Sequence, residues 1–550
     1  MTPDLVVGLD SSTSATKAIA WDREGRLVAE GRAPVALANP RPAWFEQDPE
    51  DWWSAAASAL GQLTRKIDPA RIAGLATSNQ RETFGIFSEA GEALRPGMVW
   101  LDGRSRPQML RFAESFGAER VRRISGKPLD TTPCLYRVLW LAEHEPELLA
   151  RADRLAEVHG FLCHRLTGRW ATSTASADPT GMLDMERLAW SDEILAAAGV
   201  PASKMLDLVP PGGPIGEVTA AAAAATGLRP GTPVFAGGGD GQCAGTGVAV
   251  LEPGLAYINL GTAVVSGTYA PGYAHDPAFR TEIAVADRGY VYETCQKAGT
   301  FLVDWITREL YAIPAGERGQ ALATLEAEAS AVPIGADGLL MVPYWEGCMT
   351  PHWDAAARGV IAGFSGSTRR GHIYRALLEG IALEQAEAAV RAAAVSGITI
   401  TDYAAIGGGA ASALWAQILA DATGCPVRRS AAIEASSLGA GIAAARGAGW
   451  FAGFEEAARA MAQPTLRRFE PDPARVRTYR SCAPSTPTSW PTLAAWNRRL
   501  RPSRNGQGRS RLSKDEIGIV VLPFGAQARW RVEGAGSALD LCHGWAVEIG

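Results

Sequence analysis

The sequence predicts an α/β protein with at least two domains. Strand-like and helix-like segments alternate along the chain, which is typical of helices packed on sheets. The chain has 550 residues, of which 47% are hydrophobic, whereas a single core stops growing at roughly 250–300 residues. The pattern restarts after the turn-forming residues 252–254. We therefore expect a first domain over residues 1–250 and a second over residues 251–472.

Hydrophobic periodicity and cap residues predict the individual elements. The apolar runs 5–9 and 18–21 flank a polar turn and predict a β-hairpin. Asp48 followed by Pro49 predicts a helix start, because Asp is a good N-cap and Pro suits the first helical position. Further strands are expected at residues 72–78, 233–239 and 256–260, and further helices at residues 372–395, 411–422 and after Glu434.

Three loops rich in glycine, serine and threonine follow strand-like runs. They are residues 10–17, residues 237–243 together with Gly261 and Thr262, and residues 407–409. Backbone N–H groups and hydroxyls in such turns can hold phosphate oxygens. Asp10, at the start of the first loop, is suited to orient Mg²⁺ beside phosphates. Together the loops indicate a split nucleotide site, whereas the first loop alone would favour an ordinary polar hairpin.

Composition argues against several function classes. The formal charge of −5 is small for this length, so neither nucleic acid nor an anionic membrane is indicated as a partner. No apolar stretch approaches the roughly 18 residues of a membrane span, and the N-terminus has no basic leader. The eight cysteines form no C-x-x-C pair and no zinc pattern. We expect a cytoplasmic protein with reduced cysteines.

Two common nucleotide motifs do not fit. Lys127 follows Ser125 and Gly126 but lacks the upstream glycine of a P-loop. A Rossmann fingerprint needs a helix directly after its glycines, whereas residues 16–21 continue as a strand. Residues 407–409 do precede a helix whose N-terminal N–H groups can hold an anion, and a structural turn is an equal alternative for that loop alone.

The order of these segments resembles the FGGY carbohydrate kinases over about residues 4–470. Residues 8–17 are similar to the first phosphate loop of that family, residues 239–242 to its catalytic-aspartate segment, residues 259–262 to its second phosphate loop and residues 407–409 to its adenosine loop. The resemblance implies two actin-like (ribonuclease H-like) ATPase domains flanking a central cleft. It also implies an ATP-dependent kinase that acts on a sugar hydroxyl.

The two signature patterns of that family fit unequally. One nearly fits residues 359–379, where Phe364 and Leu377 depart mildly. The other is poorer, because Arg137 stands where Lys is usual and Cys134 where Pro, Ser or Thr is expected. None of these departures touches the expected chemistry directly.

The resemblance assigns roles residue by residue. It makes Asp240 the catalytic base and Asp10 the ligand of Mg²⁺, whereas Asp240 taken alone is equally typical of a turn or cap. Phosphoryl transfer calls for positioning, charge neutralisation and one base. Lys17 neutralises phosphate charge or is a solvated residue at a strand end. The expected ATP contacts are Ser12, Thr13, Ser14, Lys17, Gly261, Thr262, Gly299, Gly408, Gly409 and Ser412.

The acceptor site is expected directly after the strand at residues 72–78. Arg81 and Glu82 look like the pair that holds adjacent hydroxyls in glycerol kinases, and a carboxylate beside a guanidinium suits vicinal diols. A surface ion pair is the alternative. The expected substrate contacts are Arg81, Glu82, Trp100, Asp102, Asp240 and Gln242.

Other residues favour a substrate larger than glycerol. Thr132 stands where glycerol kinases carry a Tyr, and a smaller side chain leaves more room. Residues 45–49 and 237–241 look closer to the pentulose kinases. We therefore favour a four- or five-carbon ketose or polyol, such as a xylulose-like pentulose, with glycerol as the alternative.

Residues 473–550 differ in composition from the rest of the chain. Residues 473–514 contain ten basic residues and no acidic one, and are rich in Pro, Ser and Arg. We expect this tail to be poorly ordered and without a function of its own, so a chain ending near Thr478 is expected to keep its activity. A basic binding arm is the alternative.

A non-enzyme remains an alternative, because a sugar-responsive regulator or an ATP-driven chaperone can use the same scaffold. The sequence has no visible helix-turn-helix domain, zinc cluster or peptide-binding domain. A kinase accounts for base, metal and acceptor sites together. A homodimer is left open, and the division of the ligand loops between two halves predicts domain closure around both substrates.

Overall fold

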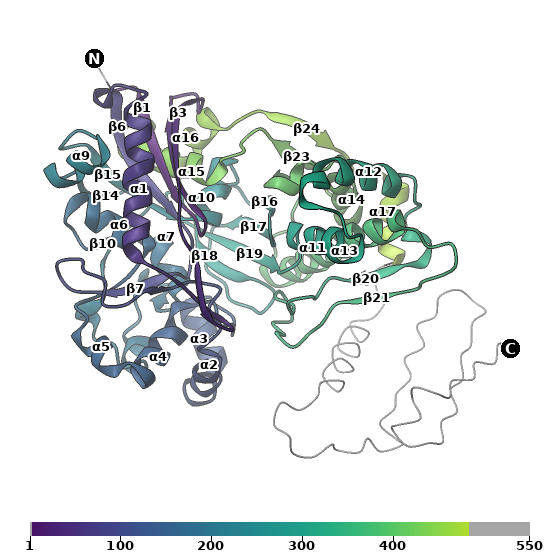
Figure 1. The fold of residues 1–550 in the computed structure, drawn as a ribbon, viewed down its shortest axis with the longest axis horizontal. Helices are drawn as coiled ribbons and strands as arrows, with labels where there is room; N and C mark the ends of the chain where they lie inside the picture. Colours follow the sequence, from purple (N-terminus) through teal and green to yellow (C-terminus); the bar gives the residue numbers. More distant parts are fainter. Residues whose placement is uncertain (1–2, 483–550) are drawn as a thin grey trace.

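The computed structural model describes residues 3–482. Two mixed β-sheets, each covered by helices, form its framework, so the predicted α/β class is confirmed. Figure 1 shows the first sheet on the left, mostly in purple and blue, and the second in the middle, in teal and green, with helices of the second half to its right. Over residues 3–482 no helix is long and apolar enough to cross a membrane.

The first sheet brings three predicted site segments to one edge. Its strands are β1 (Leu5–Ser11), β2 (Ala15–Trp21), β3 (Leu27–Pro34), β6 (Ile72–Asn79), β14 (Pro214–Glu217) and β15 (Pro233–Gly239), in the order β14-β15-β6-β1-β2-β3. Strands β1, β6 and β15 are parallel, whereas β1 and β2 form the predicted hairpin. The carboxyl ends of the parallel strands therefore meet, with Asp10 opposite Ser78 and Gly239 opposite Asn79.

Strand β1 is buried along its whole length because helices cover both faces of the sheet. Its side chains alternate between the faces. Leu5, Val7 and Leu9 pack with α1 (Pro49–Thr64) and α6 (Val158–Thr167), whereas Val6 packs with α10 (Asp240–Gly247) and α15 (Ala435–Gly447). Helix α1 begins as predicted, since the Asp48 carboxylate accepts a hydrogen bond from the N–H of Glu50.

Helix α15 belongs to the second half of the sequence but lies on the first sheet. Figure 1 shows it with α16 (Phe454–Met461), in yellow-green, and α15 packs against β1 and β6. The approach is so close that a side chain at Gly8 would lie 1.9 Å from the carbonyl oxygen of Ser437, and one at Gly439 would lie 1.8 Å from that of Cys243. The expected boundary near Leu251 thus separates the two sheets but not all of the helices that cover them.

The second sheet places the two remaining predicted loops at one edge. Its strands are β16 (Leu255–Leu260), β17 (Val264–Ala270), β18 (Arg280–Ile283), β19 (Tyr290–Gln296), β22 (Asp402–Ile406), β23 (Val427–Ser430) and β24 (Thr465–Phe469), in the order β18-β19-β17-β16-β22-β23-β24. Strands β16 and β22 are parallel, with Asn259 opposite Ile406. The loops that follow these two strands therefore lie side by side.

The helices of the second half agree with the prediction to within a few residues. The expected helices at 372–395 and 411–422 are α13 (Arg370–Ser396) and α14 (Ala413–Thr423), and the helix expected after Glu434 is α15. Helix α12 (Arg318–Ser330) packs against α13, and α13 packs against α14. Helix α11 (Thr300–Trp305) shares their apolar core.

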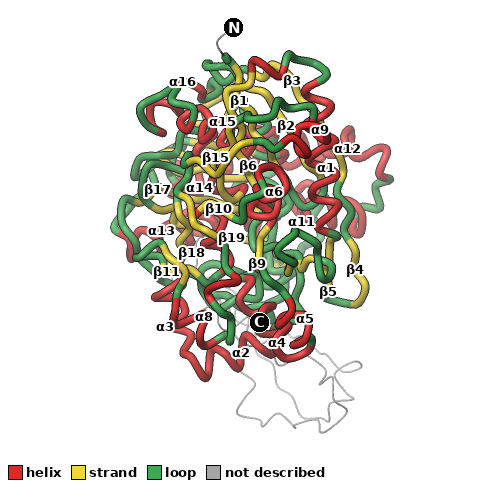
Figure 2. The backbone as a smooth tube through the Cα atoms, turned by 90° about the vertical axis from the view of Figure 1, so that its left-hand side faces the viewer, coloured by secondary structure: helices red, strands yellow, loops and turns green. Residues whose placement is uncertain are grey.

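A smaller layer extends the first half at one end. It contains α2 (Arg106–Phe112), α3 (Ala118–Ser125), α4 (Cys134–His144) and α5 (Pro146–Arg151), which lie together at the lower end in Figures 1 and 2. A five-stranded sheet adjoins them, in the order β4 (Ala38–Arg41), β5 (Trp44–Gln47), β8 (Gly97–Met98), β7 (Phe84–Phe87) and β9 (Arg154–Glu157). Strand β10 (Ala171–Ser173) pairs separately with β13 (Asp207–Val209).

The predicted start of the tail at residue 473 is wrong by about ten residues. Pro473–Cys482 form helix α17, which packs against α14. The side chain of Tyr479 is buried with the core of the second half. The buried ring of Tyr479 holds this helix against the second half although the surrounding sequence is basic. The rest of the expected tail, residues 483–550, lies outside the described residues.

Candidate functional site

Within the predicted first phosphate loop, residues 8–17, residues 12–14 form the tight turn between β1 and β2. Ser12 closes the turn, because its backbone N–H and its hydroxyl both donate to the carbonyl oxygen of Ala15 (3.0 and 2.8 Å). Ser14 is exposed. The hydroxyl oxygen of Thr13 accepts a hydrogen bond from the indole N–H of Trp100 (3.0 Å). The turn presents hydroxyls and N–H groups, which is the chemistry that binds an anion.

Asp10 ends β1 beside this loop. Its carboxylate accepts a hydrogen bond from the hydroxyl of Ser78 (2.8 Å). Burial raises the pKa of Asp10 to about 7 although the Ser78 hydrogen bond opposes the shift, and the negative charge of Asp240 raises the pKa further. A divalent cation would favour the ionised carboxylate here. Mg²⁺ usually takes only one or two protein carboxylates together with water and phosphate oxygens, so this donor set fits that ion.

Lys17 faces the second half of the chain. Its ammonium forms an ion pair with Glu434, the residue before α15, and the two side chains are 22% and 23% exposed. The same segment reaches the predicted base, because the hydroxyl of Ser436 donates to the carbonyl oxygen of Asp240 (3.0 Å). A phosphate group that binds Lys17 therefore has to compete with Glu434.

Asp240 is the first residue of α10 and directly follows β15. Its side chain is 41% exposed, and Nε of Arg81 lies 3.1 Å from its Oδ1. The N–H of Gly241 also donates to Oδ1 (2.8 Å). Among the described residues these contacts fall on Oδ1, so Oδ2 is the oxygen available to take up a proton.

A buried charge network surrounds Arg81, and its members from the second half were not predicted. Nη1 of Arg81 lies 3.0 Å from Glu293 of β19. Arg280 of β18 joins the acceptor loop, residues 80–83, to the same carboxylate, since it lies 2.8 Å from Glu82 and 2.5 Å from Glu293. The predicted partners Arg81 and Glu82 are thus each held by an opposite charge from the second sheet.

The sequence does contain a signal for this network. Arg280 and Glu282 stand two residues apart in a strand, and Glu293 lies within the apolar strand at residues 290–296. Residues two apart share one face of a strand, and buried charges are stable only when they are paired. Charges at alternate positions in a buried strand therefore indicate partners elsewhere in the chain.

The pKa values show which members of the network can hold a proton. Burial opposes ionisation of Glu293, but Arg280 and Arg81 outweigh it and lower the pKa to about 2. Burial raises the pKa of Glu82 despite the same two arginines. Asp178 lies next to this network, 3.3 Å from Nε2 of Gln242, and burial raises its pKa well above the ordinary value despite Lys127 at 3.7 Å. Glu293 is therefore the permanently charged anchor of the network.

Gln242 lies within α10, close to Asp240 and Arg81. A side chain at Gly239 would lie 2.3 Å from Oε1 of Gln242 and 2.5 Å from Cγ of Arg81, so glycine is needed between them. Nε2 of Gln242 donates to the carbonyl oxygen of Ala175 (2.8 Å), whereas Oε1 is buried and has no partner among the described residues. An unpaired buried acceptor costs roughly 1–3 kcal/mol, so this oxygen is suited to accept a hydrogen bond from a ligand hydroxyl.

Trp100 and Asp102 have different surroundings although both were expected to contact the substrate. Trp100 is 37% exposed beside the first phosphate loop. Asp102 is fully buried, where it accepts a hydrogen bond from the N–H of Phe45 (2.7 Å) and forms an ion pair with Arg104 (2.6 Å). The Asp102 carboxylate therefore fixes the backbone near Phe45 and is too deeply buried to contact a substrate beside Trp100.

The predicted second phosphate loop, Gly261 and Thr262, connects β16 to β17. The N–H of Thr300 donates to the carbonyl oxygen of Gly261 (2.8 Å). Gly299 is packed so tightly that a side chain there would lie 2.5 Å from this carbonyl oxygen. Gly299 therefore shapes the loop, and the exposed Thr262 is directed to solvent.

The predicted adenosine loop, residues 407–409, follows β22. Gly407 has φ of +83°, which favours glycine. A side chain at Gly408 would have no atom of residues 3–482 within 4 Å, so a ligand can approach there, whereas Gly409 packs against Trp415. The hydroxyl of Ser412 caps α14 by accepting a hydrogen bond from the N–H of Trp415 (3.0 Å).

Two side chains that are not among the predicted site residues, His159 and Ser173, hold a β-bulge before Asp240. The pairing of β15 with β6 is interrupted between Phe235 and Gly238. At Gly237, the N–H donates to Nε2 of His159 (3.2 Å) and the carbonyl oxygen accepts from the hydroxyl of Ser173 (2.7 Å). Burial lowers the pKa of His159 to about 3, so its imidazole stays neutral and can accept this bond. Bulges redirect a strand end, and this one sets the exit of β15 towards Asp240.

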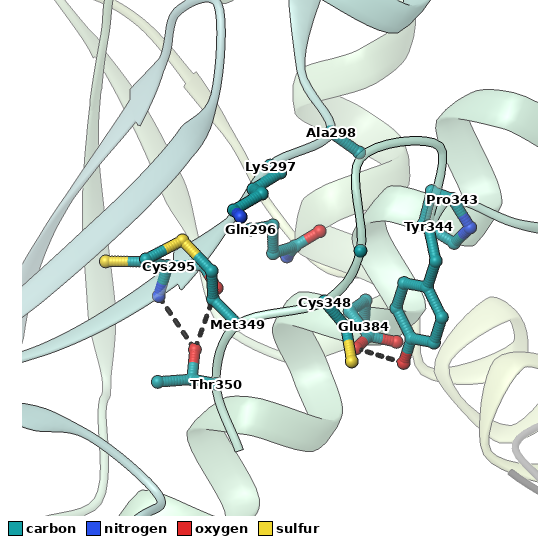
Figure 3. Close-up of a pocket in the computed structure, with 11 residues that line it drawn as sticks. Cys295, Gln296, Lys297, Ala298, Pro343, Tyr344, Cys348, Met349, Thr350 and Glu384 are labelled. Carbon is teal, nitrogen blue, oxygen red and sulfur yellow. Dashed lines mark hydrogen bonds between the residues drawn. The ribbon is translucent and has the colours of Figure 1, made fainter. Parts of the chain in front are cut away.

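A small pocket lies beside β19, and Figure 3 shows the residues that line it. Sγ of Cys295 lies 3.4 Å from Oε1 of Glu293, and the backbone N–H of Cys295 donates to the hydroxyl of Thr350 (2.7 Å). Across the pocket, the Tyr344 hydroxyl donates to Glu384 (2.6 Å), and burial raises the pKa of Glu384 to about 8. These bonds hold the loop of residues 343–350 against β19 at Thr350 and against α13 at Tyr344.

Known proteins resemble this chain over both halves. The model of the FGGY family of carbohydrate kinases, N-terminal domain, matches residues 5–247, and that of the C-terminal domain matches residues 256–448. Xylulose kinase of Bacillus subtilis (strain 168) is 30% identical over 485 residues, which cover 86% of this chain and 94% of that protein. Glycerol kinase of Methylibium petroleiphilum is 32% identical over 519 residues, which cover 90% and 98%.

A solved structure agrees with these matches. The crystal structure of xylulose kinase from Rhodospirillum rubrum has a TM-score of 0.83 and 27% identity, and the match covers 90% of this chain and 100% of that chain. Relatives named for two different substrates are similar to this chain at about the same identity. Identity alone therefore does not select between these substrates.

Proposed function

This chain belongs to the FGGY family of carbohydrate kinases, phosphotransferases that act on hydroxyl groups, and we propose that its acceptor is a four- or five-carbon ketose or polyol. A xylulose-like pentulose is the favoured acceptor, and glycerol is the alternative. A cytoplasmic location, where ATP is supplied, is part of this proposal.

The surroundings of Thr132 carry the proposal on acceptor size. Arg137 is fully buried, and its Nη2 donates to the carbonyl oxygens of both Glu82 and Thr132, the latter at 2.6 Å. This shared donor keeps Thr132 beside the acceptor loop. A threonine there fills much less space than an aromatic residue, so additional carbons of the acceptor can fit.

In the proposed reaction the acceptor hydroxyl is held by the groups around Asp240. Oε1 of Gln242 accepts a hydrogen bond from the acceptor, and Arg81 orients the Asp240 carboxylate. The hydroxyl oxygen forms a bond to the γ-phosphorus while the bond from that phosphorus to the β,γ-bridging oxygen breaks, so ADP leaves. The hydroxyl proton passes to Oδ2 of Asp240.

The remaining residues are proposed to hold the nucleotide and its metal. Thr13, Ser14, Gly261 and Thr262 would donate hydrogen bonds to phosphate oxygens, and the loop at Gly408 would contact the nucleoside. Mg²⁺ with Asp10 as its protein ligand would neutralise phosphate charge. The raised pKa of Asp10 supports this role, because a nearby cation stabilises the ionised carboxylate.

An ADP-coupled assay with ATP tests this proposal against glycerol, erythritol, xylitol, xylulose and ribulose. We expect the highest kcat/KM for a four- or five-carbon compound. The variant Thr132→Tyr should shrink the site and shift preference towards glycerol by about tenfold or more, which corresponds to roughly 1.4 kcal/mol. A wild-type preference for glycerol, or an unchanged order of acceptors in Thr132→Tyr, would contradict the proposed substrate class.

A further inference from the structure

We propose that Trp100 is a positioning residue that couples the binding of nucleotide and acceptor through a closed ring of hydrogen bonds. The ring consists of Thr13, Gln47, Gln80, Thr83 and Trp100, and it joins the first phosphate loop to the acceptor loop. The inference rests on the proposed function, since it takes Thr13 as a phosphate contact and the Trp100 ring as a wall of the acceptor site.

Every link of the ring is within hydrogen-bond distance. Nε2 of Gln47 donates to the carbonyl oxygen of Thr13 (2.7 Å), and Nε2 of Gln80 donates to Oε1 of Gln47 (2.8 Å). The hydroxyl of Thr83 donates to Oε1 of Gln80 (3.2 Å) and accepts from the backbone N–H of Trp100 (3.2 Å). The indole N–H of Trp100 then closes the ring on Oγ1 of Thr13 (3.0 Å).

The two sides of the ring differ in burial. Gln47, Gln80 and Thr83 are almost completely buried, and Oε1 of Gln47 also accepts the indole N–H of Trp52 (2.9 Å). Trp100 is partly exposed, and Thr13 lies in the turn between β1 and β2. The glutamine side is therefore a fixed frame, and the Trp100–Thr13 bond is the link that can open.

The direction of the Trp100–Thr13 bond provides the coupling. Because Oγ1 of Thr13 accepts the indole N–H, the hydroxyl proton of Thr13 points away from Trp100 and can donate to a phosphate oxygen. A phosphate that accepts this proton polarises Oγ1 and strengthens the indole bond, as in other hydrogen-bond chains. An acceptor packed on the Trp100 ring in turn holds the indole and orients Thr13. Each ligand should therefore raise the affinity for the other by the same factor.

The coupling factor is the quantity to measure. It is the Kd of the Mg²⁺ complex of AMP-PNP without acceptor divided by the Kd with saturating acceptor, determined by calorimetry. The acceptor is whichever of xylulose, ribulose, xylitol, erythritol and glycerol gives the highest kcat/KM. We expect a factor of at least about fivefold in the wild type. We expect less than about twofold in Trp100→Phe, which keeps the aromatic wall but lacks the N–H.

Further variants separate this role from a general loss of structure. Thr13→Val, which lacks the accepting oxygen, should lower the coupling factor as Trp100→Phe does, and Thr13→Ser should restore it. Combining Trp100→Phe with Thr13→Val should not lower the coupling factor further, because both changes remove the same hydrogen bond. Trp170→Phe is the matched control, since Trp170 also loses an indole hydrogen bond, to the carbonyl oxygen of Glu89 (2.9 Å), but lies outside the ring.

The outcomes distinguish this inference from the proposed function. A wild-type factor below about twofold, or a Trp100→Phe factor equal to that of the wild type, overturns the inference even if the wild type phosphorylates its acceptor. A coupling factor that is lowered in Trp170→Phe as much as in Trp100→Phe also overturns the inference. A wild type that phosphorylates none of the five acceptors contradicts the proposed substrate class and removes the inference with it.

Discussion

Nε of Arg81 lies 3.1 Å from Oδ1 of Asp240, so one guanidinium connects the acceptor loop to the predicted base. The same side chain reaches Glu293 in the second sheet at 3.0 Å. The orientation of Asp240 thus depends on residues from both halves of the chain. This relationship explains why a carboxylate that is 41% exposed can still have a defined position.

Replacing Asp240 by Asn tests the proton acceptor. The amide keeps the shape of the side chain but cannot take up the hydroxyl proton, so kcat should fall about 10²–10⁴-fold. The Kd for the Mg²⁺ complex of AMP-PNP should change little. Asp207→Asn is the control, because Asp207 is exposed on β13. A folded Asp240→Asn protein that keeps more than about a tenth of the wild-type kcat would exclude this role.

Replacing Arg280 by Met tests the link between the second sheet and the acceptor loop. The change leaves Glu82 and Glu293 without their shared partner in a buried site, which should lower the free energy of unfolding by about 3 kcal/mol and raise the acceptor KM. Chemical denaturation and acceptor titrations measure these two effects. Arg308→Met is the control, since Arg308 is 57% exposed and pairs with its neighbour Glu309.

The loss in Arg280→Met should depend on pH. Without the guanidinium, the folded-state pKa of Glu293 rises from about 2, so a carboxylate that stabilised the fold above its unfolded pKa no longer does so. Glu293 keeps its ion pair with Arg81, but both carboxylates lose the charge of Arg280. Lowering the pH protonates them more readily in the variant, so the difference in unfolding free energy from the wild type should become smaller. If the difference in unfolding free energy between the wild type and Arg280→Met increases when the pH is lowered from 8 to 5, this account of the network is contradicted.

The sequence predicts those parts of the fold and site that depend on neighbouring residues. The hairpin with its polar turn and the helix start at Asp48 are set by local hydrogen bonding and by the geometry of Pro49, so the sequence predicts them correctly. The partners Arg280 and Glu293 were missed because their contacts with the acceptor loop join residues about 200 positions apart. The return of α15 to the first sheet depends likewise on tertiary packing and not on periodicity within the helix.

The raised pKa of Asp10 predicts an unusual pH dependence of stability. Its pKa is about 7 in the folded protein against an ordinary value of 3.8, so the folded state binds the proton more tightly. This contribution is complete below about pH 4 and is lost as the pH rises through 7. Asp10→Asn removes this titration. In the absence of nucleotide, the unfolding free energy of the variant minus that of the wild type should therefore increase by about 2–3 kcal/mol when the pH is raised from 5 to 8.

Urea unfolding of both nucleotide-free proteins at the two pH values measures this gain. The variant should also lose most of its stabilisation by Mg²⁺ and ATP at pH 8, because it lacks the carboxylate that we propose as the metal ligand. Asp207→Asn again serves as the control for an exposed carboxylate. Parallel pH dependence in the wild type and Asp10→Asn would show that Asp10 is not the titrating group.

The bulge at Gly237 predicts a role for His159 in catalysis through positioning. In His159→Leu the Gly237 N–H loses its acceptor in the interior, which should lower stability by roughly 1–3 kcal/mol and reduce kcat by disturbing Asp240. His159→Gln offers an amide oxygen in its place and should recover part of both losses. The imidazole is already neutral above about pH 3, so His159 should contribute no titration near pH 6.5 to the kcat profile of the wild type, and neither variant should change the profile there. Equal activity of His159→Leu and the wild type would exclude this role.

The sequence predicts that a chain ending near Thr478 keeps its activity, but helix α17 predicts that this chain is less stable than the full chain. Such a chain lacks Tyr479, which is 1% exposed, donates its hydroxyl to Glu379 (2.9 Å) and accepts a hydrogen bond from Arg375 (3.3 Å). Loss of a buried aromatic side chain lowers stability by about 3–5 kcal/mol. A chain ending at Cys482 keeps the anchor and should unfold at a clearly higher temperature than one ending at Thr478. Tyr479→Phe in the full chain keeps the ring and should cost only about 1 kcal/mol, because it removes one hydroxyl. Equal melting temperatures for the two shortened chains would mean that Tyr479 does not anchor the second half and that the boundary at residue 473 was adequate.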